Sequence, residues 1–280
     1  MLSEKINRFY QDMHGERWPI LLEALQQPEI QIGRWNQFSS EAPKDSDFFP
    51  MSDSQEIPRD AEGLLKYYVM DPGSYWAAKA LEVQSGDQIL DLCAAPGGKS
   101  LILAEALKDS GELTANEISE ARRERLKKVI QQYIPRKIRE RVWVTGKDGG
   151  KFALTHKEKF DRILVDAPCS GERHLFANTK ELQDWKESRS EKLAQRQYAL
   201  MTAALLATKS GGRIVYSTCS VSNLENDDVI ARLLKKKEGQ FRVLLQGLPM
   251  VGAEVTEFGI RIWPDRCQGG PIYYSVLEKL

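Results

Sequence analysis

The sequence has little cysteine or histidine, no net charge and no long apolar run. Its hydrophobic stretches fall short of the roughly 20 residues that a membrane-spanning helix needs, so we expect no contact with a membrane. The four cysteines lie far apart and there are three histidines, which argues against a disulfide framework, a zinc knuckle or any other metal site. Basic and acidic residues number 40 each, so binding of a nucleic acid must depend on a local basic patch.

A targeting leader is also missing from the first residues. Residues 1–5 contain no apolar signal core and already carry an acid, which predicts a cytoplasmic protein. Hydrophobic residues make up 41% of the chain and charged residues 29%, as in a soluble globular protein. A length of 280 residues fits one large domain, or one domain with a small lobe, and we expect a monomer.

From about residue 60 onward, apolar segments of strand length alternate with helical patterns. Strands are predicted at residues 88–92, 112–117, 141–145, 160–166 and 212–217, and helices at 98–108, 119–132, 187–208 and 223–235. This alternation predicts an α/β fold with a doubly wound, Rossmann-like and mostly parallel sheet. The segments 241–247 and 272–278 are expected to pair as an antiparallel edge.

Residues 1–60 have a different pattern, and we expect them to form a short accessory segment. Helices are predicted at 4–13 and 16–27, followed by an extended connection that is rich in proline and polar residues. The main domain is then expected to occupy residues 61–280.

The stretch at residues 91–100, Asp-Leu-Cys-Ala-Ala-Pro-Gly-Gly-Lys-Ser, joins a predicted strand to a predicted helix. Its small residues allow the backbone to approach a ligand closely, and the helix start offers unpaired N–H groups. In a parallel sheet such a turn forms one wall of a ligand crevice. One alternative is a phosphate-binding P-loop, because residues 98–100 match the end of that motif, but Cys93 stands where its first glycine should be. The other alternative is a tight turn without a ligand.

Acidic residues stand at or just after the ends of the next three predicted strands, at Glu117, Asp148 and Asp166. Because the carboxyl ends of parallel strands share one edge of the sheet, these acids are expected to line the crevice. Glu117 is placed to accept hydrogen bonds from both hydroxyls of a ribose, and Asp148 from an exocyclic amine. A triphosphate would be repelled by three acids that Lys99 alone offsets. The row of acceptors therefore favours S-adenosylmethionine, a nucleoside with a cationic tail.

Two cysteines follow neighbouring predicted strands, in the turn-like segments Asp-Ala-Pro-Cys-Ser-Gly (166–171) and Ser-Thr-Cys-Ser (217–220). We expect Cys169 and Cys219 on the same rim of the sheet. A thiolate beside S-adenosylmethionine suits methylation of cytosine carbon 5, because its addition to carbon 6 makes carbon 5 nucleophilic. A protonated Asp166 would donate to ring nitrogen 3, and Lys99 would favour the thiolate. The target base must be unstacked to reach such a pocket.

These motifs, in this order, resemble the RNA cytosine-C5 methyltransferases of the Nol/Nop/Sun group. The match covers roughly residues 60–280 and is carried by segments 90–99, 166–171 and 217–220. The resemblance implies a catalytic domain at 61–280 in which Cys219 is the nucleophile and Cys169 assists release of the methylated base. It also implies that Asp166 and Lys99 orient the base. The residues expected to hold S-adenosylmethionine are Cys93, Ala94, Ala95, Pro96, Gly97, Gly98, Lys99, Glu117, Asp148 and Asp166.

The chain looks most similar to the compact mitochondrial members of this group, which act on small-subunit rRNA or on tRNA, and we expect a bacterial relative. The predicted substrate is rRNA, with tRNA as an alternative, bound directly or delivered by a protein partner. At residues 264–271 the chain departs from the usual ending of the family, a His followed by Asp-Gly-Phe-Phe. A second hypothesis is a non-catalytic RNA-binding or ribosome-assembly protein that keeps cofactor binding.

Overall fold

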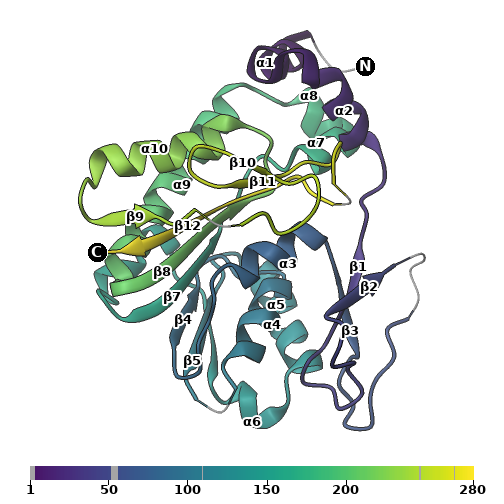
Figure 1. Cartoon of the computed structure of the whole chain (residues 1–280), viewed down its shortest axis with the longest axis vertical. Coiled ribbons are helices and arrows are strands. Elements are labelled where there is room, and N and C mark those ends of the chain that lie inside the picture. The colour runs from purple at the N-terminus through teal and green to yellow at the C-terminus, as the bar shows by residue number, and fades with distance from the viewer. Residues whose placement is uncertain (1–3, 52–55, 109, 246, 268) are drawn as a thin grey trace.

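The computed structural model describes the chain except for residues 1–3, 52–55, 109, 246 and 268. Its centre is a parallel sheet (Figure 1). The strands of this part are β4 (Gln88–Asp91), β5 (Glu112–Asn116), β6 (Val142–Thr145), β7 (Phe160–Asp166) and β8 (Thr208–Thr218). They lie in the order β6-β5-β4-β7-β8, and every neighbouring pair is parallel. The predicted α/β fold with a doubly wound sheet is confirmed.

Antiparallel strands extend the sheet beyond β8. They are β9 (Phe241–Val243), β10 (Glu254–Val255), β11 (Ile260–Ile262) and β12 (Ile272–Lys279). Strand β12 pairs with β8, with β11 and, at its far end, with β9. The predicted antiparallel edge is therefore present. Strands β10 and β11 were not predicted, because segments of two or three residues have no measurable periodicity.

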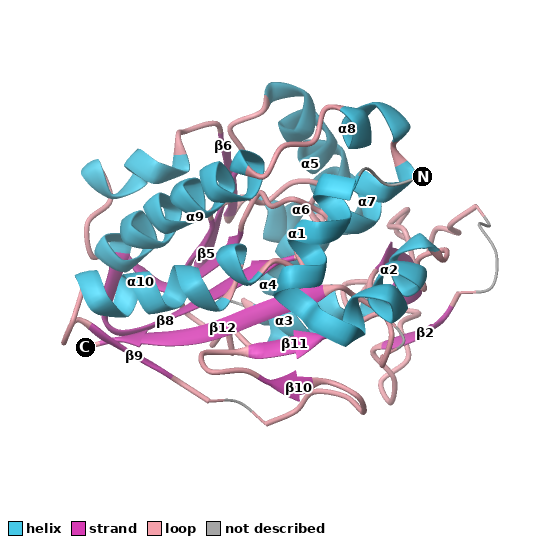
Figure 2. Cartoon of the chain, turned by 90° about the horizontal axis from the view of Figure 1, so that it is seen from above, coloured by secondary structure: helices cyan, strands magenta, loops and turns pink. Residues whose placement is uncertain are grey.

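Helices cover both faces of the large sheet (Figure 2). One core contains side chains of α3 (Pro72–Lys79), α4 (Gly98–Ala106) and α5 (Glu120–Tyr133), and the other those of α9 (Ser188–Ala207) and α10 (Asp227–Lys236). In β7, Leu164 enters the first core while Ile163 and Val165 enter the second, as expected for a strand buried on both faces. Within the described ranges, no helix is long and apolar enough to cross a membrane.

Short helices connect the larger elements. They are α6 (Arg136–Arg139), η2 (Gly149–Leu154), α7 (Glu172–Ala177), α8 (Thr179–Gln183) and η3 (Asn223–Glu225). The sequence pattern predicted loops at several of these places, because one or two turns of helix are too short to show an apolar stripe. Two of them, α7 and η3, directly follow the two cysteine motifs and so determine the path of the chain beside the thiols.

The N-terminal residues form α1 (Glu4–His14), η1 (Gly15–Arg17) and α2 (Trp18–Gln26), close to where helices were expected. Their buried side chains include Ile6, Tyr10 and Trp18, which pack in one cluster with Leu175 of α7 and with Val221. The two N-terminal helices therefore lie against the segments that follow both cysteine motifs.

A second, small sheet lies between α2 and α3. Strand β1 (Ile32–Trp35) pairs antiparallel with β2 (Phe48–Pro50) and with β3 (Tyr67–Met70). The segment expected as an extended connection contains the strands β1 and β2, which were not predicted because such short strands depend on partners that are distant in sequence. Strand β1 lies before residue 60 and its partner β3 lies after it. The division of the chain at residue 60 stays a prediction.

Candidate active site

The glycine-rich turn starts at the carboxyl end of β4 and leads into α4. Gly97 has a φ of +123°, a conformation that side chains rarely adopt, and α4 begins at the next residue. A Cβ atom on Gly98 would lie 2.5 Å from the ring of Tyr68, so glycine is needed for the turn to pack against β3. With this packing, residues 93–99 form the wall of a cavity.

The two motif cysteines meet at the same edge of the sheet. Their sulfur atoms lie 3.1 Å apart, and the backbone N–H of Cys219 donates to the Cys169 sulfur at 3.3 Å. Cys219 is exposed, whereas Cys169 is half-buried. The hydrogen bond with Cys219, followed by burial, raises the pKa of the Cys169 thiol well above its ordinary value. The structure therefore brings both thiols to one point on the rim, within reach of a single small substrate group.

Both thiols border a cavity of about 670 Å³ that Lys99 and Asp166 also border. The Lys99 ammonium donates to Asp166 Oδ2 at 2.8 Å and to Ser74 Oγ at 3.1 Å, and Ser217 Oγ donates to Asp166 Oδ1 at 2.8 Å. Burial alone would lower the pKa of Lys99, but the charge and hydrogen bond of Asp166 raise it above its ordinary value. A cation therefore lies beside the thiol pair, and the four predicted catalytic side chains share one cavity.

Two smaller cavities extend this space along the glycine-rich turn. The first, of about 230 Å³, is bordered by residues 93–99 together with Asp91 and Asp166. The second, of about 190 Å³, shares Cys93 with the first and is bordered by Asn116 and Glu117. An elongated ligand, such as a nucleoside that carries an amino-acid tail, fits a row of neighbouring cavities of this kind.

Two acids, each with one carboxyl oxygen that lacks a well-aligned hydrogen bond, border the two smaller cavities. Ser100 Oγ donates to Asp91 Oδ2 at 2.6 Å, while Asp91 Oδ1 has no partner among the described atoms. Burial raises the pKa of Asp91 to about 7. The backbone of Ser119 donates to Glu117 Oε1 at 2.9 Å, whereas Oε2 has an ion-pair contact with Arg122 at 3.2 Å but no well-aligned hydrogen bond. These positions fit a ligand that donates from ammonium and hydroxyl groups, as the expected cofactor does.

Asp148 lies apart from this row of cavities. It begins η2, where its Oδ1 accepts from the backbone of Gly150 at 3.1 Å, and it is exposed. It borders neither of the smaller cavities, although the neighbouring Gly149 borders the second. The contact of Asp148 with an adenine amine stays a prediction.

Two side chains that border the thiol cavity were not predicted for the site. Asp71 caps α3 by accepting from the backbone of Ser74 at 3.1 Å, and also accepts from the backbone of Gly270 at 2.6 Å. Arg122 borders both the thiol cavity and the second small cavity, and donates to the Ala95 carbonyl at 2.6 Å. The sequence around Asp71 gives no sign of this role, because a contact 199 residues away leaves no local signal.

The other two cysteines have different surroundings. Cys93 borders both small cavities, and burial raises its pKa. Cys267 is buried in the core that also contains side chains of α3, α4 and α5. In the part of the chain that the structure describes, no group of three or more His, Cys, Asp or Glu side chains is placed to hold a metal ion.

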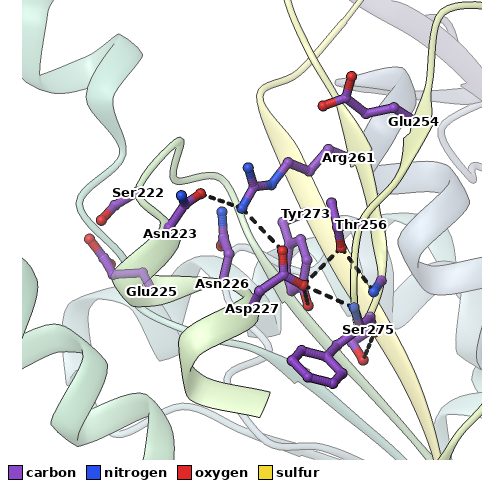
Figure 3. A network of polar contacts seen from close by, with 12 residues as sticks. Ser222, Asn223, Glu225, Asn226, Asp227, Glu254, Thr256, Arg261, Tyr273 and Ser275 are labelled. Atoms are coloured by element: carbon purple, nitrogen blue, oxygen red, sulfur yellow. Dashed lines mark hydrogen bonds and ion pairs between the residues drawn. The ribbon is translucent and has the colours of Figure 1, made fainter. Parts of the chain in front are cut away.

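A polar network around Asp227 attaches η3 and α10 to the antiparallel strands (Figure 3). Arg261 of β11 donates to Asn223 Oδ1 at 2.6 Å and forms an ion pair with Asp227 at 3.3 Å. The hydroxyls of Thr256 and Tyr273 both donate to Asp227 Oδ1 at 2.8 Å. Because η3 directly follows the second cysteine motif, this network anchors one side of the segment that carries the exposed thiol.

The sequence matches the family model described as 16S rRNA methyltransferase RsmB/F over residues 78–278. The 5-cytosine rRNA methyltransferase NSUN4 of Mus musculus is 41% identical over 191 residues, which is 66% of this chain. A mitochondrial tRNA (cytosine(34)-C(5))-methyltransferase of Danio rerio is 34% identical over 237 residues, or 78% of this chain. The ribosomal RNA small subunit methyltransferase F of Shewanella loihica is 32% identical over 249 residues, or 85%. The chain spans 49%, 62% and 50% of the lengths of these three relatives.

Solved structures with the same fold cover nearly the whole chain. NSun6 from Pyrococcus horikoshii with SFG superposes with a TM-score of 0.80 at 20% identity, covering 99% of this chain and 98% of that one. A methyltransferase homolog protein from the same organism superposes with a TM-score of 0.79 at 22% identity, covering 99% and 95%. At these identities the likeness establishes the fold.

Proposed function

Because the chain belongs to the RsmB/F family of RNA cytosine-C5 methyltransferases, we propose that it methylates carbon 5 of a cytosine in RNA. S-adenosylmethionine is the cofactor of this family. The observation that carries the proposal is the 3.1 Å separation of the Cys169 and Cys219 sulfurs in a cavity shared with Lys99 and Asp166. Activation of a pyrimidine requires a thiol that adds to the ring and a group that assists its departure. The P-loop alternative is wrong, because the family is one of methyltransferases.

In the proposed reaction, Cys219 is the nucleophile. Its sulfur adds to carbon 6 of the cytosine, and the electron pair of the ring double bond moves to carbon 5, which bonds to the methyl group that S-adenosylmethionine supplies. Transfer of the carbon 5 proton to a base then restores the double bond and expels the Cys219 thiolate. The exposure of Cys219 supports this assignment, because an RNA base must reach the nucleophile. Cys169, half-buried and within contact of the first sulfur, is proposed to assist the release.

Lys99 and Asp166 are proposed to orient the base, and Lys99 is proposed to favour the reactive form of the thiol. Burial lowers the pKa of Lys99, whereas the charge and hydrogen bond of Asp166 raise it, and the interaction with Cys219 raises it further by a smaller amount. An ammonium group next to a thiol stabilises the thiolate. Hydrogen bonds from Lys99 and Ser217 determine the orientation of the Asp166 carboxyl group, which is proposed to contact ring nitrogen 3, where negative charge develops.

The cofactor is proposed to lie along the two smaller cavities. The backbone of residues 93–99 would hold its amino-acid end, Glu117 the ribose hydroxyls, and Asp148 the adenine amine. Arg122 already contacts Glu117 at 3.2 Å, so the ribose would take over acceptor positions that the guanidinium now uses. The unpaired Oδ1 of Asp91 supports this placement, since an ammonium group would satisfy it.

Small-subunit rRNA is the proposed substrate. The matching family model is described for 16S rRNA, and relatives at 41% and 32% identity are named as rRNA methyltransferases. A relative at 34% identity is named as a tRNA methyltransferase, which makes tRNA the alternative substrate. A monomer in the cytoplasm, receiving RNA directly or from a protein partner, stays the prediction from the sequence.

The assignment of the two thiols is tested by replacing each cysteine and supplying S-adenosylmethionine with unmodified total rRNA or tRNA. Cys219→Ala should reduce methyl transfer to background, because the nucleophile is gone. Cys169→Ala should accumulate a covalent protein–RNA adduct that survives a denaturing gel. The control is Cys267→Ala, which removes a thiol from the core and should retain transfer.

Each outcome separates the alternatives. An active Cys219→Ala variant would refute Cys219 as the nucleophile. Bisulfite sequencing of RNA from cells with and without the gene should show the loss of a 5-methylcytosine in small-subunit rRNA. A loss confined to tRNA would establish the alternative substrate, and no loss in any RNA would support a non-catalytic RNA-binding protein.

A further inference from the structure

Two buried glutamates follow the two cysteine motifs. Glu172 begins α7, just after the first motif, and Glu225 ends η3, just after the second. Both residues are fully buried. All the hydrogen-bond donors that the described residues direct at these carboxyl groups are neutral hydroxyl, amide or backbone groups. Two acids without a cationic partner are costly to bury, so their position calls for a reason.

Each glutamate holds the loop that carries the other cysteine. Glu172, which follows the first cysteine, accepts from Ser220 Oγ at 2.9 Å, next to the second cysteine. Glu225, which follows the second cysteine, accepts from the backbone N–H of Ser170 at 3.0 Å and from its hydroxyl, next to the first cysteine. We call Glu172, Glu225, Ser170 and Ser220 the reciprocal clasp. The clasp joins two loops that lie beyond the ends of β7 and β8, where strand pairing no longer holds them.

The hydroxyl of Ser220 connects the two acids directly. Its Oγ lies 2.9 Å from Glu172 Oε1 and 3.3 Å from Glu225 Oε1. A hydroxyl donates to one carboxyl oxygen and accepts from another when one of the two acids is protonated. Burial raises the pKa of both glutamates, and the charge of Glu225 raises that of Glu172 further. Both effects favour one shared proton and one negative charge.

Other elements complete the surroundings of the clasp. From α1, the Tyr10 hydroxyl donates to Glu172 Oε1 at 2.9 Å. From α9, Gln197 donates to Glu225 Oε2 at 2.9 Å, and the Ser190 hydroxyl lies 3.2 Å from that of Ser170. Among the described residues, the nearby charged or titratable groups are Cys169, which the two acids affect, Tyr216 of β8, which the charge of Glu225 affects, and Arg189, which acts on Tyr10.

We propose that Glu172 and Glu225 are positioning residues that set the distance between the two catalytic thiols, by clasping each cysteine loop from the other and sharing one proton through Ser220. Neither acid borders the thiol cavity, so both act through the loops and not on the substrate. The purpose of the clasp rests on the proposed function, but its effect on the sulfur–sulfur distance does not depend on RNA or cofactor.

The test measures thiol proximity in the purified full-length protein, without RNA or cofactor. Dibromobimane becomes strongly fluorescent when two neighbouring thiols alkylate it, and peptide mass spectrometry identifies the bridged pair. Glu225→Ala should slow bridging of Cys169 to Cys219 by about tenfold, because the Ser170 loop loses its acceptor. Glu225→Gln should bridge within about twofold of the wild-type rate, because its amide can donate to both serine hydroxyls while its carbonyl accepts from the backbone.

A matched control separates positioning from stability. Glu105 is another buried acid, on α4, where it pairs with Arg34 at 2.7 Å. Glu105→Gln should lower the free energy of unfolding but leave the bridging rate unchanged. If Glu225→Ala does not fold, Ser220→Ala replaces it in the bridging measurement, because it removes only the shared hydroxyl. Ser220→Ala should slow bridging about threefold.

Two results would overturn the clasp. One is wild-type bridging in a folded Glu225→Ala or Ser220→Ala variant, and the other is a Glu225→Gln variant as slow as Glu225→Ala. Normal bridging in a wild-type protein that methylates no RNA would instead overturn the proposed function and leave the clasp intact.

Discussion

Two acidic centres hold the segment after Cys219 from opposite sides, and they differ in how their charge is balanced. In the reciprocal clasp, every donor that the described part of the chain directs at Glu172 and Glu225 is neutral. At the other centre, Asp227 lies 3.3 Å from Arg261, which carries the compensating charge (Figure 3). An ion pair holds its partners at all moderate pH values, whereas two acids that share a proton respond to pH. The segment after Cys219 is therefore held by one ion pair, which persists at moderate pH, and by the reciprocal clasp, which depends on protonation.

Removing the ion pair between Asp227 and Arg261 should have the largest effect on stability. Asp227→Ala removes the ion-pair partner of Arg261, whose side chain is largely buried. We therefore expect a loss of about 3–5 kcal/mol in the free energy of unfolding in urea. The control is Glu158→Gln, which removes an exposed ion pair with Lys279 and should cause no measurable change. A loss at Asp227 no larger than in the control would show that the ion pair does not anchor the loop.

The pH dependence of stability should distinguish the clasp from the ion pair. Because burial and the charge of Glu225 raise the pKa of Glu172 above its ordinary value of 4.5, the folded protein binds a proton that the unfolded chain releases. This contribution to stability is complete below pH 4.5 and is lost as the pH rises through the raised pKa. The free energy of unfolding should therefore fall more steeply with rising pH in the wild type than in a Glu172→Gln/Glu225→Gln variant.

The comparison of the two proteins removes the contributions of other groups. Burial raises the pKa of Asp91 to about 7, which acts in the same direction as the clasp, and lowers that of His14 to about 4, which acts in the opposite one. Both groups are present in the wild type and in the double variant. Parallel stability curves for the two proteins would therefore contradict a shared proton.

The smallest expected effect on stability concerns two tyrosines, each of which donates a hydrogen bond to a carboxyl group of one of the two centres. Tyr273 donates to Asp227 at 2.8 Å and Tyr10 to Glu172 at 2.9 Å, and both are buried. A hydrogen bond to a full charge is stronger than one to a charge spread over two carboxyl groups, so Tyr273→Phe should cost about 2 kcal/mol and Tyr10→Phe about 1 kcal/mol. Urea unfolding at neutral pH measures both losses, and a larger loss for Tyr10→Phe would reverse the assignment of charge.

The parallel sheet and the meeting of the thiols could be predicted because both depend on local patterns. Ile163, Leu164 and Val165 read as one apolar run because the strand is buried on both faces. The two cysteines lie just beyond the ends of β7 and β8, which pair in register, with Asp166 opposite Ser217. Once neighbouring strands are predicted, the geometry of the sheet brings these cysteines together.

The clasp and the small sheet could not be predicted, because their partners are distant in sequence and of ordinary composition. Nothing in the local pattern marks Glu172 or Glu225 as buried, yet packing of α1 and α9 buries both completely. Each of these outcomes depends on tertiary contacts that only the folded chain provides.

The insertion of β12 beside β8 has a consequence for the order of synthesis on the ribosome. Gly270, Pro271 and Ile272 border the thiol cavity, and the backbone of Gly270 donates to Asp71, 199 residues earlier in the chain. While a nascent chain ends before residue 272, β8 presents an unpaired edge and the cavity lacks one wall, which is a risk for aggregation. The cavity is thus completed only when the strand that closes it has emerged, late in the synthesis of the chain.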